Sequence, residues 1–457
     1  MAFGKTDSSG LPQGTWLGGH YLGKGGDGTL HYWTKVGENR KIIDRMVIKD
    51  LYSRESTMEP SEYRAIYDDL VAKGMDFGAV APGSSGPSLP EQRFFREAYL
   101  QALFTDPSGA STYTVPLRGY KRGHSDTGRG THWRVYMDLL HAGDLENFMR
   151  KHNDADGESI PFPEPFIWWT LYCLAKALVD LDQRVQTKLG PRSAEGEVVV
   201  MIDMKLPNML LDAKRGSEYP LYPKPLVSDF GSAHILHKAD PRSKKGGIKL
   251  HATDGYWAPE MDVIEGVDRA INEPLHSWTN VWQAGRVIEF MMVKASTANE
   301  GTYGDSNIKK YPPEFDEFPN FRYSNELIEI VWRCQLFDPK AQPTPAELLL
   351  YIEQHAPALN KGMDTWGSAN WIAAQKLIKG APTFVEVIGR DERIRKRIRS
   401  GKLSFLKNFE DQALAKEYAN LEMDPPDDCL LAYQGGADPA RLGMEGKEPV
   451  AGDDADW

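Results

Sequence analysis

Residues 201–211 read MIDMKLPNMLL, a short polar loop between two apolar runs. The run over residues 198–202 leads into the loop and a pair of leucines leaves it, so the pattern predicts strand, tight turn, strand. The polar residues of the loop are Asp203, Lys205 and Asn208. A carboxylate can accept a hydroxyl proton, an ammonium can hold a phosphoryl oxygen, and an amide oxygen suits Mg²⁺. Taken alone, the three are more often the turn residues of an ordinary loop.

Two further motifs follow along the chain. Residues 226–231 read LVSDFG, which places Asp229 after a second apolar strand, and residues 258–260 read APE. In this order the three segments resemble the protein-kinase family. Asp203, Lys205 and Asn208 match the catalytic loop of that family, Asp-x-Lys-x-x-Asn, and Asp229 matches its metal-binding Asp-Phe-Gly. Each motif is weak alone, but their order and separations together are specific.

The resemblance covers about residues 21–355 and implies a fold of the α+β class. It implies a bilobal protein-kinase-like fold, with a small β-rich N-lobe and a larger helical C-lobe. The expected divisions are a flexible leader, an N-lobe with an insertion, a C-lobe, and a partly helical extension with an acidic, disordered end. Their bounds are 1–14 for the leader, 15–138 for the N-lobe with its insertion at about 53–90, 139–355 for the C-lobe, and 356–457 for the extension.

A glycine motif lies near the start of this region. Gly23, Gly25 and Gly28 fit Gly-x-Gly-x-x-Gly, in which glycines let backbone N–H groups approach phosphates. An ordinary hairpin turn is the more frequent explanation of a lone match. Residues 30–36 look like a strand, whereas a dinucleotide-binding fold needs a helix directly after the glycines. The arrangement strand, glycines, strand is that of the kinase family.

Two charged residues are expected to handle the phosphates of ATP. Residues 42–50 predict a strand that carries Lys49, and residues 91–104 predict a helix that carries Glu97. In the resemblance, Lys49 pairs with the α- and β-phosphates and Glu97 holds the lysine. An edge-strand lysine and a solvated helix glutamate are the ordinary alternatives.

The segment that would contact adenine follows two more predicted strands, at 113–120 and 131–140. Met137, Asp138 and Leu140 resemble the interlobe hinge of the family, with Met137 in the gatekeeper place. A long apolar helix is predicted over 165–183, and its two tryptophans are interpreted as core residues.

Four supporting positions depart from the family pattern. Met201 and Ile202 stand where the family usually has His and Arg, Asn280 replaces a helix aspartate that braces the catalytic loop, and Gln342 replaces the arginine that pairs with Glu260. In many family members the arginine before the catalytic aspartate binds a phosphate on the activation segment. Ile202 has no donor, so the sequence predicts activity without phosphorylation of that segment.

Composition excludes several classes of protein. The net charge of −11 argues against a general nucleic-acid binder, and the three cysteines have no metal-binding or disulfide spacing. The most apolar run, residues 166–179, is too short to span a bilayer. These features predict a soluble intracellular protein without a membrane partner. It is expected in the cytoplasm, and a basic cluster at 393–399 leaves nuclear import as a minority alternative.

The resemblance implies transfer of the γ-phosphoryl group of MgATP to serine or threonine hydroxyls of protein substrates. Asp203 would take the proton, Lys205 would offset charge, and Asn208 with Asp229 would hold Mg²⁺. A nucleotide-binding pseudokinase that scaffolds partners is the first alternative, and a small-molecule phosphotransferase the second. The extension is a possible site for a regulatory protein partner.

Overall fold

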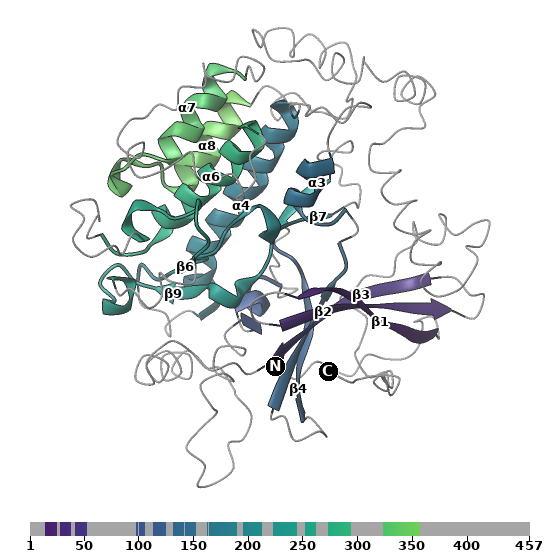
Figure 1. Ribbon diagram of the computed structural model, residues 1–457. Helices are drawn as coiled ribbons and strands as arrows, with labels where there is room; N and C mark the ends of the chain where they lie inside the picture. Colours follow the sequence, from purple (N-terminus) through teal and green to yellow (C-terminus); the bar gives the residue numbers. More distant parts are fainter. Residues whose placement is uncertain are drawn as a thin grey trace, which may run out of the picture. The chain divides into compact units, whose positions relative to one another are not determined.

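The computed structural model describes a mixed α+β protein with a β-sheet and a group of helices (Figure 1). The α+β class is therefore confirmed. The leader, the insertion and the extension lie outside the described residues, apart from residues 14 and 356 at their edges. The described residues are 14–24, 28–37, 42–52, 97–98, 100–105, 113–124, 131–140, 142–151, 162, 164–189, 195–212, 223–244, 252–261, 273–293 and 323–356.

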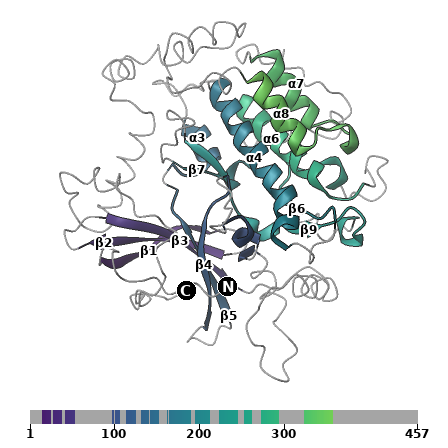
Figure 2. The same ribbon diagram turned by 180° about the vertical axis from the view of Figure 1, so that it is seen from behind.

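The described residues fall into two compact units. The first contains the described residues from 14 to 105 and from 115 to 139, and the second contains 113–114 and those from 140 to 356. An antiparallel sheet forms most of the first unit, in the order β1-β2-β3-β5-β4 (Figures 1 and 2). Its strands are β1 (Gly14–Lys24), β2 (Gly28–Gly37), β3 (Ile42–Tyr52), β4 (Leu117–His124) and β5 (Thr131–Asp138).

The strands expected at 30–36 and 42–50 are confirmed as β2 and β3, whereas the strand expected over 113–120 is wrong in its first half. Strand β4 begins only at Leu117, because Pro116 has no N–H to donate to a ladder. Thr114 forms an isolated parallel bridge with Val227 instead. Residues 97–98 and 100–105 are helical, as predicted for the segment that ends at Phe104.

Alternation along β3 separates the two faces of this sheet. Met46 and Ile48 pack on one face with Trp33 and Tyr136 in a buried apolar cluster. Lys49 follows Ile48, so its side chain emerges on the opposite face. This alternation is what directs the charged group of β3 away from the apolar cluster.

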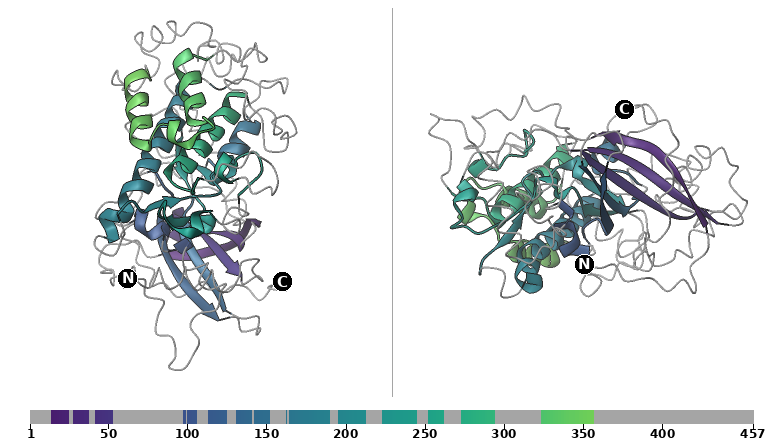
Figure 3. Two further views of the ribbon diagram at one scale, coloured as in Figure 1. Left: turned by 90° about the vertical axis from the view of Figure 1, so that its left-hand side faces the viewer. Right: turned by 90° about the horizontal axis from the view of Figure 1, so that it is seen from below.

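Helix α4 (Glu164–Leu189) is the core of the second unit. It packs against helices α6 and α8 and against strands β6 and β8, and the helices lie side by side in Figure 1 and in the left view of Figure 3. The remaining elements are α3 (Leu145–Lys151), β6 (Val198–Val200), β7 (Met209–Asp212), β8 (Lys224–Val227), β9 (His234–Leu236), α6 (Ser277–Val293), α7 (Asn325–Cys334) and α8 (Pro345–His355).

The helix predicted over 165–183 is confirmed, and it continues to Leu189. Its tryptophans are core residues, as interpreted: Trp168 is 1% exposed and Trp169 is 2% exposed. Each indole finds an acceptor, since Trp168 donates to Glu164 at 2.9 Å and Trp169 to the Pro223 carbonyl at 3.2 Å. None of the helices in the described ranges is long and apolar enough to cross a membrane.

Local sequence explains where the last two helices begin. Ser324 caps α7 by accepting from the Leu327 N–H, and Thr344 forms a capping box with Glu347 at the start of α8. Pro345 fits the first turn of α8, where no N–H is needed. Each cap contributes about 1 kcal/mol to helix stability.

Candidate functional site

The loop predicted from residues 201–211 connects two short strands of the second unit. Strand β6 pairs with β9, and β7 pairs with β8, so strand, loop, strand is confirmed. Residues Leu206–Asn208 form a single 3₁₀ turn with Pro207 in its first positions. The Asn208 N–H donates to the Lys205 carbonyl at 2.9 Å, which closes the turn.

The polar groups of this loop meet at the Asp203 carboxylate. The Lys205 ammonium lies 2.8 Å from Asp203 Oδ2. The Thr253 hydroxyl donates to Asp203 Oδ1 at 2.6 Å and accepts from Lys205 Nζ at 2.7 Å. The Thr253 N–H also donates to Oδ1, at 3.1 Å. A hydroxyl therefore lies between a carboxylate and an ammonium.

Burial raises the pKa of the Asp203 carboxyl above its ordinary value. Hydrogen bonds and charge from Lys205, and the hydrogen bond from Thr253, oppose this rise, while the charge of Asp229 adds to it. A carboxylate with a raised pKa is a stronger base. The environment therefore suits Asp203 to accepting a proton from a bound hydroxyl.

Thr253 belongs to the segment that precedes Ala258, and this segment is bonded to both the loop and α6. The Thr253 hydroxyl contacts both Asp203 and Lys205 of the loop. Tyr256 accepts from the Leu206 N–H at 3.3 Å, and Arg286 of α6 donates to the Gly255 carbonyl at 2.8 Å. These bonds fix the position of the segment beside the loop.

The two residues expected to bind a metal are connected through the backbone. Ser228, which precedes Asp229, donates its N–H and its hydroxyl to the Asn208 carbonyl at 2.9 and 2.8 Å. The Asn208 amide nitrogen donates to the Asp203 carbonyl at 2.8 Å. Asp229 adopts a left-handed backbone, with φ +61°, and its carboxylate accepts from the Gly231 N–H at 3.4 Å.

This donor set fits Mg²⁺ in chemistry and in number. One carboxylate, Asp229, and one amide, Asn208, match a Mg²⁺ site that relies on phosphate oxygens and water for its other ligands. Among the described residues there is no group of three or more His, Cys, Asp or Glu that could hold a metal by itself. A metal at this place would therefore depend on a phosphate ligand.

The first unit contains the other predicted charged pair. Lys49 of β3 donates to Glu97 at 2.7 Å, and the two side chains are 10% and 3% exposed. Gln101, one helical turn after Glu97, donates to the Val115 carbonyl at 3.0 Å and connects the helix to the residues before β4. The expectation that Glu97, rather than a solvated glutamate, pairs with Lys49 is confirmed.

The three predicted glycines have different surroundings. A Cβ at Gly28 would lie 2.1 Å from the Asp50 carbonyl oxygen, so the packing of β2 on β3 alone requires glycine there. A Cβ at Gly23 would meet nothing within 4 Å, so protein packing does not explain that glycine. Gly25 lies outside the described residues. A role in phosphate binding stays a prediction for all three.

The predicted hinge residues differ in what their side chains contact. The Asp138 carboxylate accepts from Arg118 Nε at 2.6 Å, and the same guanidinium donates to both Asp44 oxygens, at 2.8 and 2.9 Å. Met137 is half-buried and Leu140 is buried. The Asp138 side chain thus binds Arg118 of the same sheet. Only its backbone groups would contact a ligand.

Two of the residues that depart from the family pattern, Asn280 and Gln342, make hydrogen bonds to the backbone. Asn280 accepts from the Met201 N–H at 2.9 Å and donates to the Val199 carbonyl at 2.7 Å, so a neutral amide braces the loop. Gln342 donates to the Leu336 carbonyl at 2.9 Å. Glu260 accepts from the Thr279 hydroxyl at 2.6 Å.

A site residue that sequence reasoning missed is Gln283, one turn after Asn280 on α6. It donates to the Ile202 carbonyl at 2.6 Å and accepts from the Met204 N–H at 3.4 Å. A polar residue in the otherwise apolar run 281–285 was the available signal.

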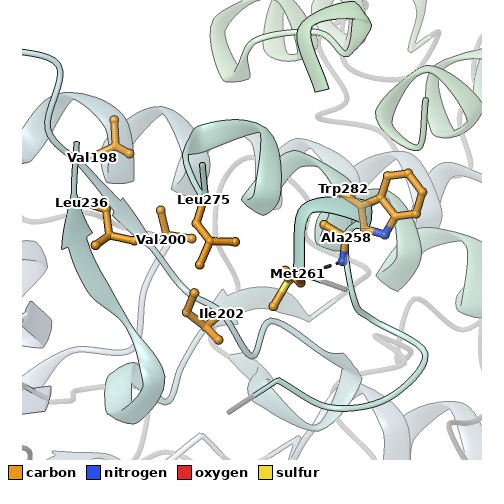
Figure 4. Packing of buried hydrophobic residues seen from close by; sticks show 8 residues of the cluster. All are labelled: Val198, Val200, Ile202, Leu236, Ala258, Met261, Leu275 and Trp282. Atoms are coloured by element: carbon orange, nitrogen blue, oxygen red, sulfur yellow. Dashed lines mark hydrogen bonds between the residues drawn. The ribbon is translucent and has the colours of Figure 1, made fainter. Parts of the chain in front are cut away.

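Ile202 is buried in an apolar cluster, shown in Figure 4, which we call the Ile202 cluster. Its eight members come from β6, the loop that follows β6, β9, the segment around residue 260, residue 275 and α6. They are Val198, Val200, Ile202, Leu236, Ala258, Met261, Leu275 and Trp282. The cluster therefore connects the loop to the end of the segment that carries Thr253.

Ser243, a hydroxyl residue in the segment between Asp229 and Ala258, is fully buried. Its hydroxyl donates to the Asp240 carbonyl at 2.6 Å, and its own carbonyl accepts from the Leu275 N–H at 3.0 Å. The segment is thus anchored by backbone bonds and by Leu275 of the Ile202 cluster. In this conformation, Ser243 is closed to a modifying enzyme.

We expect phosphatase-treated protein to keep the phosphotransfer rate of untreated protein, because apolar packing orders this segment. Ser243→Ala should change that rate less than twofold while losing one hydrogen bond, which contributes about 1 kcal/mol to stability. Rates and melting temperatures of both proteins provide the check. Restoration of a lost rate by rephosphorylating Ser243 would contradict the argument from Ile202. Thr253→Ala is a less clean probe, because the Thr253 hydroxyl contacts Asp203 and Lys205.

Comparison with known proteins finds similarity to a curated protein. No protein-family model matches the sequence. The chain is 24% identical over 259 residues to a probable serine/threonine-protein kinase of Dictyostelium discoideum. The match covers 56% of this chain and 28% of that protein, so the chain spans about a quarter of the length of the relative. At this identity, the comparison indicates a kinase-like chain.

Proposed function

We propose that this protein is a protein kinase that transfers the γ-phosphoryl group of MgATP to serine or threonine hydroxyls of protein substrates. The observation that supports it most is the place of the Thr253 hydroxyl, 2.6 Å from Asp203 Oδ1 and 2.7 Å from Lys205 Nζ. A hydroxyl there has a base for its proton and a cation beside its oxygen. An acceptor hydroxyl in phosphoryl transfer needs the same two partners.

In this proposal the loop of the second unit performs the chemistry. Asp203 orients the acceptor hydroxyl and takes its proton as that oxygen bonds to phosphorus. Lys205 offsets negative charge on the phosphoryl group. Asn208 and Asp229 hold Mg²⁺, which, when bound, neutralises phosphate charge. Such catalysis is positioning together with electrostatics, so the loss of one group costs more than its contact area suggests.

In the same proposal the first unit holds ATP. Lys49, fixed by Glu97 at 2.7 Å, positions the phosphates, and Gly23, Gly25 and Gly28 cover them. The backbone groups of 137–140 contact adenine. The burial of Lys49 and Glu97 supports this role. Removing two charges from water costs folding free energy, so a buried ion pair is weak evidence for a purely stabilising role.

We expect MgATP to raise the melting temperature of this protein and Lys49→Met to blunt the rise. A ligand at about a hundred times its Kd stabilises a fold by about 2.7 kcal/mol. Lys49→Met removes the cation that would meet the phosphates, and Lys35→Met on the neighbouring strand is the matched control. Thermal unfolding with and without millimolar MgATP measures both. An equal rise in Lys49→Met would refute phosphate binding by Lys49.

Transfer of label from radiolabelled ATP to a generic protein substrate tests the function itself. We expect phosphoserine or phosphothreonine as the product, because the spacing of Asp203 and Lys205 matches the serine/threonine branch of the family. Label found mainly on phosphotyrosine, or only on small molecules, would overturn the proposal. The relative from Dictyostelium discoideum, a probable serine/threonine-protein kinase, supports the same acceptor class.

A nucleotide-binding scaffold is the second candidate. It is favoured by the neutral or apolar residues at Ile202, Asn280 and Gln342, since each replaces a charged residue of the family pattern. A scaffold of this kind would show the thermal shift with MgATP and no transfer of label. The two assays together therefore separate the candidates.

A further inference from the structure

Two fully buried amides on α6 contact the backbone of the catalytic loop on both sides of Asp203. Asn280 and Gln283 lie three residues apart, so they share one face of the helix. Asn280 binds the Met201 N–H before the aspartate. Gln283 binds the Ile202 carbonyl directly before it and the Met204 N–H directly after it.

The backbone at this point is strained. Ile202 has φ +64° in a chain segment where a β-branched residue strongly prefers negative φ. Such a conformation costs about 1–3 kcal/mol and persists only where the surroundings over-determine it. The buried side chain of Ile202 is one constraint, and the 2.6 Å bond from Gln283 to its carbonyl is the other.

The chemistry of the two targets specifies glutamine. The Ile202 carbonyl needs a donor and the Met204 N–H needs an acceptor, and one amide side chain supplies both. Methionine has nearly the same length and supplies neither. Ionised glutamate supplies only an acceptor, and its charge would face the Ile202 carbonyl at close range. The two bonded peptide groups flank Asp203, so together they determine where its Cα and carboxylate lie.

We infer that Gln283 is a positioning residue for the proposed reaction, which holds Asp203 in the orientation needed to take the acceptor proton. This inference rests on the proposed function. Gln283 lies behind the loop and acts through the backbone, so its loss lowers the rate of the chemical step. The affinity for MgATP, which the proposal assigns mainly to residues of the first unit, stays unchanged. A residue that served stability alone would lower the melting temperature and leave kcat of the folded protein intact.

The experiment compares Gln283→Met with Gln283→Glu and with Gln335→Met as the matched control. Gln335 is also fully buried on a backbone carbonyl, that of Val331, but does not touch the loop. We expect Gln283→Met to lose about tenfold to hundredfold in kcat at temperatures where it is folded, with KM for MgATP unchanged. Gln335→Met should keep kcat. A kcat of Gln283→Met within twofold of the wild-type value would overturn the inference.

Gln283→Glu adds a pH profile that a purely structural role would not produce. A protonated carboxyl can donate to Ile202 and accept from Met204, as the amide does, whereas the ionised form cannot donate. The ratio of its kcat to that of the wild type should therefore approach one at acidic pH and fall as pH rises. The wild-type profile is measured in the same buffers, so the ratio reports the change that the glutamate introduces. A ratio independent of pH would contradict the inference, even where Gln283→Met fails to fold.

Hydrogen–deuterium exchange separates the inference from the proposed function. Peptides that cover residues 198–211 should exchange faster in Gln283→Met than in wild type, while peptides of α4 should not change. If the wild type transfers no label, the proposed function fails. The exchange data then test by themselves whether Gln283 holds the backbone on both sides of Asp203. Unchanged exchange over 198–211 would overturn the positioning role whatever the activity.

Discussion

Asp203→Asn lowers the rate of phosphotransfer about 10²–10⁴-fold, the usual contribution of a general base, if the proposed function is correct. That range corresponds to about 3–5 kcal/mol of transition-state stabilisation. Asparagine keeps the shape of the side chain and can still accept from the Thr253 N–H. It cannot take a proton, and it removes the charge 2.8 Å from the Lys205 ammonium.

The fold of Asp203→Asn should survive. Burial raises the pKa of this carboxyl, so the folded state favours the protonated form and ionisation at neutral pH costs stability. A neutral amide removes that cost, which offsets the loss of the ion pair with Lys205. We therefore expect a melting temperature within a few degrees of wild type.

The matched control for this prediction is Asp180→Asn on α4. Asp180 pairs with Arg184 at 3.2 Å in a half-buried position on the helix. Its loss removes an ion pair of the same kind without touching the loop, so the rate should not change. A wild-type rate in Asp203→Asn, measured as single-turnover transfer of labelled phosphate, would exclude Asp203 as the base.

Features set by neighbouring residues could be predicted from the sequence. The turn between β6 and β7 follows from an apolar run, three polar residues and a second apolar run. The helix that contains Trp168 and Trp169 follows from a long apolar segment with a proline at its start. The contact of Lys49 with Glu97 followed from the family resemblance, which supplies long-range information that periodicity lacks.

Contacts between distant segments that the resemblance does not supply could not be predicted, because a single sequence does not show which polar residue meets which partner. Arg118 joins Asp44 to Asp138 across 74 and 20 residues of sequence. Gln283 reaches the Ile202 carbonyl across 81 residues. Each partner is an ordinary polar residue in its own segment, and only the packing of the elements brings it to its target.

Two of the four departures from the family pattern, at residues 280 and 202, had different outcomes. The substitution at residue 280 suggested a lost brace, whereas Asn280 makes two bonds where an ionised aspartate could only accept. Ile202 was expected to make activity independent of a phosphate on the segment, and in the structure its side chain packs in the apolar Ile202 cluster. At both positions, the neutral or apolar residue makes a contact of its own with the surrounding structure, which differs from the contact that the charged residue of the family pattern would make.

Ile202→Arg should destabilise the protein by several kcal/mol, although arginine is the residue that the family usually has there. Ile202 is fully buried, and none of the eight side chains in the Ile202 cluster carries a charge (Figure 4). An unpaired buried charge costs about 3–5 kcal/mol, a large share of the 5–15 kcal/mol that stabilises a typical domain. Denaturant unfolding measures the change.

Ile202→Val is the control for that prediction, since it removes one methylene group and keeps the cluster apolar. Its cost should be about 0.5–1.5 kcal/mol. If Ile202→Arg instead unfolded at the same denaturant concentration as wild type, its side chain would have to reach solvent or an acidic partner, and the cluster would not order the segment. A gain of dependence on phosphorylation in that variant would show the same, because a new guanidinium beside Asp203 could then bind a phosphate. Loss of stability without such dependence is the outcome that follows from an apolar contact at this position.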